Sequence, residues 1–219
     1  MCMLTVSGTD TIAGSLANVL FHLLNNPGTL RSLTTEIRNN FSEVSEIRIS
    51  QTLHNCKYLA ACIDEGLRLT SIVGGILLRE VGPGGITIDG QSIPSGVDVG
   101  VPQHVIMRNP KYFEAPLEFR PQRWIPTETS AEEIKNARSA FCPFLMGPTG
   151  CPGKFWALVE MKITLAQLVF QYDLKEGLAN DCRDMSMEQR LHQRDRHGLD
   201  RFVITNKGPF VKFRLRNGV

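Results

Sequence analysis

The sequence lacks several features that would place it in a specialised class of protein. Only six of its 219 residues are cysteine, and no two of these form a Cys-x-x-Cys pair. A disulfide scaffold is therefore excluded, and a structural zinc site is not expected. The net charge is only +2, and no stripe of lysine and arginine with interleaved aromatics occurs, so we expect no nucleic-acid partner. These absences favour a reduced, intracellular setting.

No lysine or arginine occurs before Arg31, although residues 3–24 are rich in apolar side chains. A secretory signal needs a basic start. A membrane span needs about 18 nearly uncharged apolar residues, whereas Asp10 and several hydroxyl and amide side chains interrupt this run. We therefore predict a core helix over residues 3–24 and no membrane anchor in this chain. No capping residue precedes the helix, so we expect the chain to be the C-terminal piece of a longer protein.

The residues that are present are typical of a folded domain, with 42% hydrophobic and 21% charged side chains. Apolar periodicity predicts helices over residues 3–24, 29–40, 51–70 and 152–172, the last with Pro152 in its first turn. Short β-type runs lie at 76–81, 86–89 and 97–101, and Asp89-Gly90 predicts a hairpin turn. Little periodicity is found over 108–150, and a terminal hairpin is predicted from 202–205 and 210–215. The expected fold class is α+β, mainly α with small β-sheets.

The most informative segment runs from Phe144 to Gly153 and leads into the last predicted helix. The pattern places Cys151 at a helix N-terminus, where the positive end of the helix dipole favours the thiolate, the form that binds metals. Gly147, Gly150 and Gly153 remove side-chain bulk, so a flat ligand can lie close to the backbone. The alternative is a buried, inert cysteine beside a glycine-rich turn, which is common for free cysteines.

Glu65 and Arg68 lie three residues apart on the third predicted helix and therefore share a face on which they can pair. Helical projection places both in one polar arc with Lys57 and Asp64. Periodicity alone thus favours an ordinary solvated ion pair of little energetic value. Arg123, in the irregular stretch, could reach this pair and tie the loop to the helix; otherwise it is simply a charged loop residue.

Asp10 and Thr11 form the third candidate group, near the start of the first predicted helix. In helical projection Asp10 falls in an apolar arc between Ala17 and Phe21, which predicts a buried carboxylate that needs a partner. With a hydroxyl beside it and Gly8 leaving space, this carboxylate could pass protons to a molecule bound against the helix. The alternative is a local hydrogen bond from a hydroxyl to the backbone that bends the helix.

Taken together, these ordered segments resemble the C-terminal half of a cytochrome P450, a haem-thiolate monooxygenase. The matching positions are the oxygen-activation motif at 7–11, the Glu-x-x-Arg pair at Glu65 and Arg68, its third partner Arg123, and the cysteine loop at Phe144, Gly147, Cys151 and Gly153. The runs at 84–90, 93–96 and 108–110, with Arg123-Trp124, are similar to fungal members that decorate secondary metabolites.

The resemblance covers the whole chain, 1–219, as a partial cytochrome P450 domain. Its expected segments are the oxygen-activation helix at 1–24, the Glu-x-x-Arg helix at 51–70, the meander and cysteine loop at 108–150, the haem-proximal helix at 152–172 and the terminal hairpin at 202–215. The resemblance implies that full-length members are anchored in the endoplasmic-reticulum membrane, and we expect no anchor in this chain.

The family's activity then implies roles for particular residues. Haem b would be the cofactor, with the Cys151 thiolate as axial ligand of the iron, and Arg79 would pair with a haem propionate. Asp10 and Thr11 would deliver protons on the opposite face. The structural triad that would hold the loop beneath the haem is Glu65, Arg68 and Arg123.

Partners and substrate follow from the same resemblance. An NADPH-dependent reductase would donate electrons. Residues 72–78 and the turn near Gly208 correspond to segments that line the family's substrate pocket, and their apolar character indicates a lipophilic small-molecule substrate.

Some positions depart from the family's pattern. Thr149 stands where an arginine usually contacts a haem propionate, and Ile12 replaces a frequent second hydroxyl. Leu145 and Pro152 are unusual within the loop. Two alternatives to an active monooxygenase therefore stay open: a truncated, non-catalytic remnant that binds haem weakly or not at all, and a zinc or redox-thiol protein.

Overall fold

A computed structural model of the chain describes residues 2–73, 75–177 and 209–216, with side chains from Ser7 onward. The α-helices are α1 Cys2–Asn25, α2 Pro27–Asn40, α3 Gln51–Asn55, α4 Lys57–Leu69, α5 Gln103–Ile106, α6 Ala131–Ala140 and α7 Lys154–Gln171. Short 3-10 turns are η1 Val44–Glu46, η2 Pro121–Trp124 and η3 Gly147–Thr149. The strands are β1 Arg79–Glu80, β2 Ile86–Ile88, β3 Gln91–Ile93, β4 Asp98–Val99, β5 Tyr172–Glu176 and β6 Val211–Leu215.

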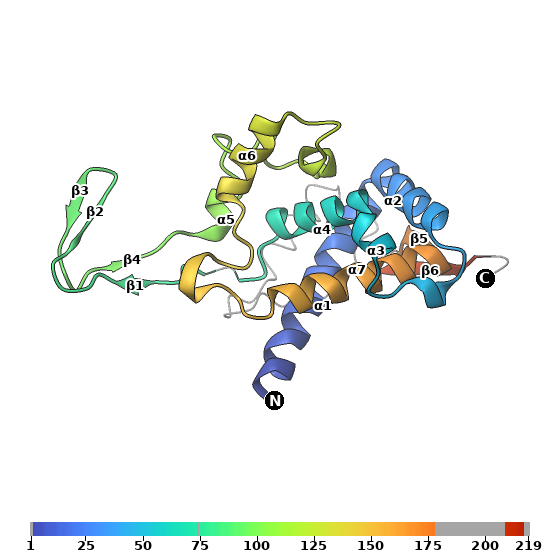
Figure 1. The fold of residues 1–219 in the computed structure, drawn as a ribbon, viewed down its shortest axis with the longest axis horizontal. Helices are drawn as coiled ribbons and strands as arrows, with labels where there is room; N and C mark the ends of the chain where they lie inside the picture. The colour runs from blue at the N-terminus through green and yellow to red at the C-terminus, as the bar shows by residue number, and fades with distance from the viewer. Residues whose placement is uncertain (1, 74, 178–208, 217–219) are drawn as a thin grey trace.

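The main body is a packed group of helices, α1, α2, α4 and α7 (Figure 1). Each contributes fully buried side chains to one core, among them Leu23, Leu33, Ile63 and Leu165. The prediction of a mainly helical α+β fold is confirmed. No helix within the described residues has both the length and the apolarity needed to cross a bilayer.

Helices α1 and α4 approach closely at Gly66. A Cβ atom added there would lie 2.6 Å from Val19 Cγ2 and 3.2 Å from the Val19 Cα. Any larger side chain would therefore push the two helices apart. The absence of a side chain at Gly66 allows α4 to lie against α1.

The segment predicted as one helix over 51–70 is two helices, α3 and α4, separated at Cys56. The break is stabilised from outside the segment. The Glu36 carboxylate of α2 accepts hydrogen bonds from the backbone N–H groups of Tyr58 (2.9 Å) and Leu59 (2.8 Å). These are donors that a helix start leaves without intrahelical partners, so Glu36 caps α4 and fixes its first turn against α2.

The stretch predicted to be irregular, 108–150, contains a regular helix, α6. A capping box begins it: the Ser130 hydroxyl accepts from the Glu133 N–H at 3.2 Å, and the Glu133 carboxylate accepts from the Ser130 N–H at 3.1 Å. Ala137 and Ala140 pack with Phe113 and Trp124 into a second, smaller core. With only two small residues on its buried face, α6 has little apolar periodicity to detect.

The strands form three two-stranded antiparallel pairs, β1–β4, β2–β3 and β5–β6. The predicted turn at Asp89-Gly90 joins β2 to β3, with φ values of +48° and +78°. The sequence did not predict that β6 pairs with β5, with Tyr172 opposite Leu215. The terminal hairpin predicted from 202–205 and 210–215 is not tested, because residues 202–205 lie outside the described residues.

Candidate functional site

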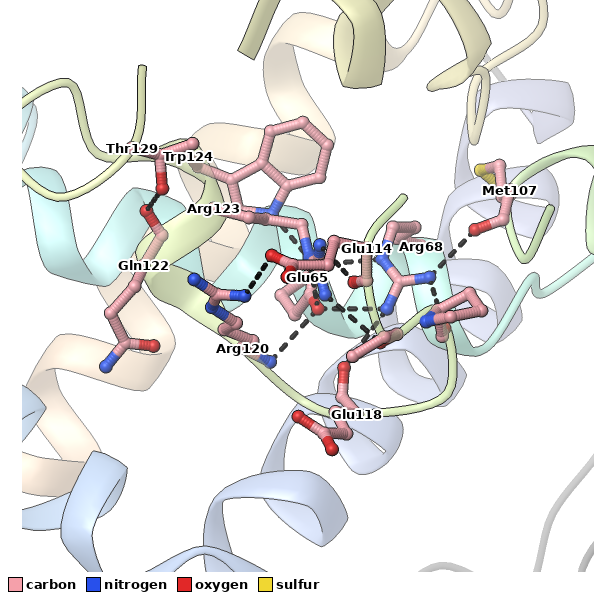
Figure 2. Close-up of polar contacts among 12 residues, drawn as sticks. Glu65, Arg68, Met107, Glu114, Glu118, Arg120, Gln122, Arg123, Trp124 and Thr129 are labelled. Atoms are coloured by element: carbon pink, nitrogen blue, oxygen red, sulfur yellow. Dashed lines mark hydrogen bonds and ion pairs between the residues drawn. The ribbon is translucent and has the colours of Figure 1, made fainter. Parts of the chain in front are cut away.

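The best-defined polar centre of the molecule is the ion pair between Glu65 and Arg68 on α4. Both residues are fully buried. Arg68 donates from Nε and Nη2 to the two carboxylate oxygens, each at 2.9 Å. The prediction of a solvent-exposed ion pair, which helical periodicity favoured, is therefore wrong. Residues 107–124 cover this face of α4, as Figure 2 shows.

Residues from η2 complete the coordination of the Glu65 carboxylate. Arg123 Nε donates to Oε1 at 2.9 Å, and the indole Nε1 of Trp124 donates to Oε2 at 2.9 Å. The backbone N–H of Arg120 adds a third donor at 3.0 Å. Two buried guanidinium groups thus share one carboxylate whose oxygens are fully occupied, the arrangement that makes a buried charge tolerable.

The remaining donors of Arg68 bind carbonyl oxygens of the facing segment. Its guanidinium contacts the carbonyls of Met107 at 2.8 Å, Pro116 at 2.7 Å and Glu118 at 3.2 Å (Figure 2). Because this segment has little regular structure, these carbonyls depend on Arg68 for hydrogen bonds. The pair therefore anchors residues 107–124 to α4.

Trp124 was not assigned a role by sequence reasoning. The signal available in the sequence was that Trp124 directly follows Arg123. A buried indole N–H needs a hydrogen-bond acceptor, and the carboxylate expected to pair with Arg123 could supply it. The Trp124 ring also lies beneath the Arg138 guanidinium, 4.4 Å from its centroid, and so connects α6 to the same centre.

The cysteine loop lies between α6 and α7. The Cys151 N–H donates to the Phe144 carbonyl at 2.8 Å, which closes the loop on itself. Leu145 and Gly147 both adopt left-handed φ values, +63° and +68°. Glycine adopts this conformation readily, whereas Leu145 is strained there. Pro152 precedes α7 instead of lying in its first turn, because the helix begins at Lys154.

The described cysteines differ in accessibility. Cys151 is exposed, Cys142 is half-buried, and Cys56 and Cys62 are buried. Burial raises the pKa of the Cys56 thiol to about 11, with the nearby Glu36 carboxylate adding to the shift. Burial also raises the pKa values of Cys62 and Cys142. The alternative that Cys151 is a buried, inert cysteine is therefore wrong, because its side chain is exposed. Cys56 and Cys62 are the buried cysteines.

Asp10 and Thr11 lie on the N-terminal part of α1, which projects from the helical body (Figure 1). Asp10 is exposed, not buried as its apolar arc predicted, since no described segment covers these turns. The Thr11 hydroxyl donates to the carbonyl of Ser7 at 2.8 Å and lies 3.2 Å from that of Gly8. This is the local bond to the backbone considered as the alternative.

Arg79 lies on β1 and is exposed; its guanidinium donates to the Leu78 carbonyl at 2.8 Å. Two neighbouring apolar residues, Ile76 and Leu78, are about half exposed. The turn near Gly208 lies outside the described residues. The structure thus brings Glu65, Arg68 and Arg123 into contact. Within the described residues, no hydrogen bond or ion pair joins Asp10, Thr11 or Arg79 to Cys151.

The residues around Cys151 fit a haem group. The thiol is accessible on a loop in which Gly150 could not carry a side chain easily, because a Cβ there would lie 3.1 Å from the Gly147 carbonyl oxygen. A soft thiolate is a suitable iron ligand, and Arg79 offers a guanidinium for a carboxylate. No group of three or more His, Cys, Asp or Glu side chains suited to a metal ion occurs among the described residues, which leaves the zinc hypothesis without a site there.

Comparison with known proteins identifies the family. The Cytochrome P450 family model matches residues 1–197. The chain is 35% identical to the cytochrome P450 monooxygenase apf8 of Gibberella fujikuroi, over 97% of this chain and 58% of that protein. It is also 35% identical to the cytochrome P450 monooxygenase AKT7 of Alternaria alternata, over 96% of this chain and 42% of that protein. A third relative, sesterfisheric acid synthase of Neosartorya fischeri, is 36% identical over 79% of this chain and 31% of its own length.

The chain spans about half the length of the curated relatives it matches. Those matches, the match of the family model to nearly the whole chain, and the presence of both a buried Glu65–Arg68–Arg123 centre and an exposed loop cysteine agree with one another. The chain belongs to the cytochrome P450 family.

Proposed function

We propose that this chain is the C-terminal part of a haem-dependent monooxygenase that oxidises a lipophilic small molecule in fungal secondary metabolism. The observation that carries the proposal is the exposed Cys151 thiol on a glycine-rich loop that leads into α7. The names and organisms of the relatives support the reaction class and the biological setting.

The residues that would hold haem b are Cys151, whose thiolate would bind the iron, and Arg79, whose guanidinium would pair with a propionate. When bound, the haem supplies activation of dioxygen and insertion of one oxygen atom into the substrate, with electrons from an NADPH-dependent reductase. Phe144 and Gly147 shape the loop: the Phe144 carbonyl accepts from the Cys151 N–H, and Gly147 supplies the left-handed turn. Gly153 caps α7 directly after the ligand loop.

Asp10 and Thr11 would move protons at the haem site. The exposed Asp10 carboxylate can exchange protons with solvent. The Thr11 hydroxyl, which donates to the Ser7 carbonyl in this structure, keeps its lone pairs available to accept a hydrogen bond. To relay a proton, this hydroxyl would have to accept one on its oxygen and give up its own, so its O–H would turn from the Ser7 carbonyl toward the acceptor.

Glu65, Arg68 and Arg123 would act as positioning residues. They contact neither the cysteine loop nor a ligand site in the described chain; they hold residues 107–124 against α4. The indirect effect on the cysteine loop would run through α6, which follows this segment and ends beside Phe141.

The non-catalytic remnant remains a second candidate function because of Thr149. This exposed residue of η3 offers no positive charge where the family usually places an arginine. A haem with one anchoring charge fewer would bind more weakly and release more readily.

The test is the absorbance spectrum of the haem-supplemented chain after reduction and exposure to carbon monoxide. A strongly red-shifted thiolate band that is lost in Cys151→Ala and kept in Cys142→Ala is expected for the monooxygenase. No thiolate band in the wild-type chain would support the remnant. A band that survives Cys151→Ala would refute Cys151 as the ligand. Substrate turnover with a reductase would then separate an active enzyme from a haem binder.

A further inference from the structure

A pocket of about 400 Å³ lies between α4, α6, the start of the cysteine loop and α7. Its volume is in the range of small-molecule sites. Cys151 does not line it, although Phe144 and Leu145 of the cysteine loop do. Its wall combines the aromatic rings of Phe141 and Phe144 with three cations, Arg138, Lys154 and Lys162.

The charges around the pocket are unbalanced. Asp64 is its single acidic residue, and it is already paired with Arg138 at 2.7 Å. Within the described chain, neither Lys154 nor Lys162 lies within ion-pair distance of a carboxylate. Two lysine side chains, Lys154 exposed and Lys162 half-buried, thus line a partly open, partly apolar pocket, whose concave wall strengthens their positive potential.

Arg138 is held in a fixed orientation before any ligand arrives. Its guanidinium carbon lies 4.4 Å from the ring centroid of Trp124 and 5.3 Å from that of Phe141. Its Nη2 forms an ion pair with the Asp64 carboxylate. A guanidinium has five N–H donors, so donors remain for a second acid. Preorganisation of this kind lowers the entropy cost of binding an anion.

We propose that this pocket binds a small organic acid whose apolar body lies between Phe141 and Phe144 and whose carboxylate contacts Lys154, Lys162 and Arg138. The two aromatic rings favour a ligand with an apolar body, and the lysines favour a ligand with an acid group. The volume of the pocket limits the ligand to a small molecule. The site does not depend on haem, so its test uses the haem-free 219-residue chain and is independent of the test of the monooxygenase.

The probe is 2-naphthoate, measured by isothermal titration calorimetry beside its neutral counterpart 2-naphthalenemethanol and inorganic phosphate. We expect 2-naphthoate to bind at least tenfold more tightly than either. Equal affinity for the alcohol would show that the cations contribute nothing, and equal affinity for phosphate would show that the apolar wall contributes nothing. Either result, or no binding of 2-naphthoate, would overturn the proposal.

Variants then locate the site. Lys154→Gln with Lys162→Gln should reduce 2-naphthoate affinity at least tenfold, whereas Lys135→Gln, an exposed lysine of α6 outside the pocket, should not change it. Ala60→Leu fills the pocket without altering charge and should also abolish binding. Unchanged affinity in both the double variant and Ala60→Leu would place the acid elsewhere and refute the site. The comparison of the three probes on the wild-type chain needs no variant to fold.

Discussion

At the residue scale, the carboxylate of Glu65 has the most demanding environment in the described chain. It is fully buried and pairs with two guanidinium groups, those of Arg68 and Arg123. Desolvating three charges is costly, and only complete coordination offsets the cost. Such a centre adds little net stability when intact and a large penalty when one member is removed.

Replacing Glu65 with glutamine should therefore destabilise the fold by about 3–5 kcal/mol, because two buried positive charges lose their counter-ion. The measurement is the free energy of unfolding in urea. Glu114→Gln is the matched control: Glu114 forms an exposed pair with Arg120, so its loss should cost less than about 1 kcal/mol. Similar losses for the two variants would contradict the central role of Glu65.

The thiol of Cys56 should make the fold sensitive to alkaline pH. Its pKa is raised from 9.0 to about 11, first by burial and second by Glu36. The folded state therefore retains the thiol proton more strongly than the unfolded state. The stability that this proton contributes is complete below pH 9 and is lost as the pH rises toward 11.

Alkylation by iodoacetamide, mapped by peptide mass spectrometry, tests this pKa directly. Modification of Cys56 in the folded chain should rise only as the pH approaches 11, whereas in the urea-unfolded chain it should rise near pH 9. The unfolded sample is the internal control. If Cys56 reacts equally in both states at pH 9, the buried thiol described here is incorrect.

Residue burial was the feature that the sequence predicted least well. Periodicity put Glu65 and Arg68 in a polar arc and Asp10 in an apolar one, and both environments are the reverse. Helical projection reports only one helix. Such a projection cannot show that residues 107–124, distant in sequence, cover α4. Nor can it show that no described segment covers the first turns of α1.

At the scale of elements, helix α6 depends on the residue that caps its N-terminus, Ser130. Its buried face offers only Ala137 and Ala140, so local capping supplies much of what holds its N-terminus. Ser130→Ala should cost about 1 kcal/mol, because the Glu133 N–H loses its acceptor. Hydrogen exchange of the first α6 amides should accelerate. Ser139→Ala, which removes an exposed bond to the Asn136 carbonyl, is the control and should leave those amides unchanged.

The crossing of α1 and α4 leads to a prediction about two glycines. Gly66→Ala should destabilise the fold by about 1–3 kcal/mol, because the new Cβ would overlap Val19 and force the helices apart. Gly28→Ala, in α2, has no neighbour within 4 Å and should be neutral or stabilise by up to about 1 kcal/mol. Urea unfolding of both variants measures the difference, and a neutral Gly66→Ala would mean that the helices are not in contact there.

Element prediction succeeded where the signal was local and failed where it was not. The Asp89-Gly90 turn and the long apolar helices α1 and α7 follow from nearby residues. The division between α3 and α4 depends on Glu36, some twenty residues away, which no local pattern reveals. Helix α6 did carry a local signal, the Ser130-x-x-Glu133 capping box, although it has little apolar periodicity.

At the scale of the whole molecule, stability is concentrated in the helical body. The β2–β3 hairpin extends away from it (Figure 1), and Ile86 is half exposed whereas Ile63 is fully buried. Ile63→Val should therefore cost about 0.5–1.5 kcal/mol, and the same change at Ile86 should stay within about 0.5 kcal/mol. Thermal unfolding of the two variants measures this contrast. Equal losses would mean that the hairpin is part of the core.

The shared carboxylate of Glu65 also sets an order of events during synthesis. Arg123 follows it by 58 positions and Trp124 by 59. At a synthesis rate of about 5–20 residues per second, the ribosome adds these two residues to the chain roughly 3–12 seconds after Glu65. Until then α4 carries a charged face that water must solvate. Its docking onto residues 107–124 is therefore a late step, timed by translation.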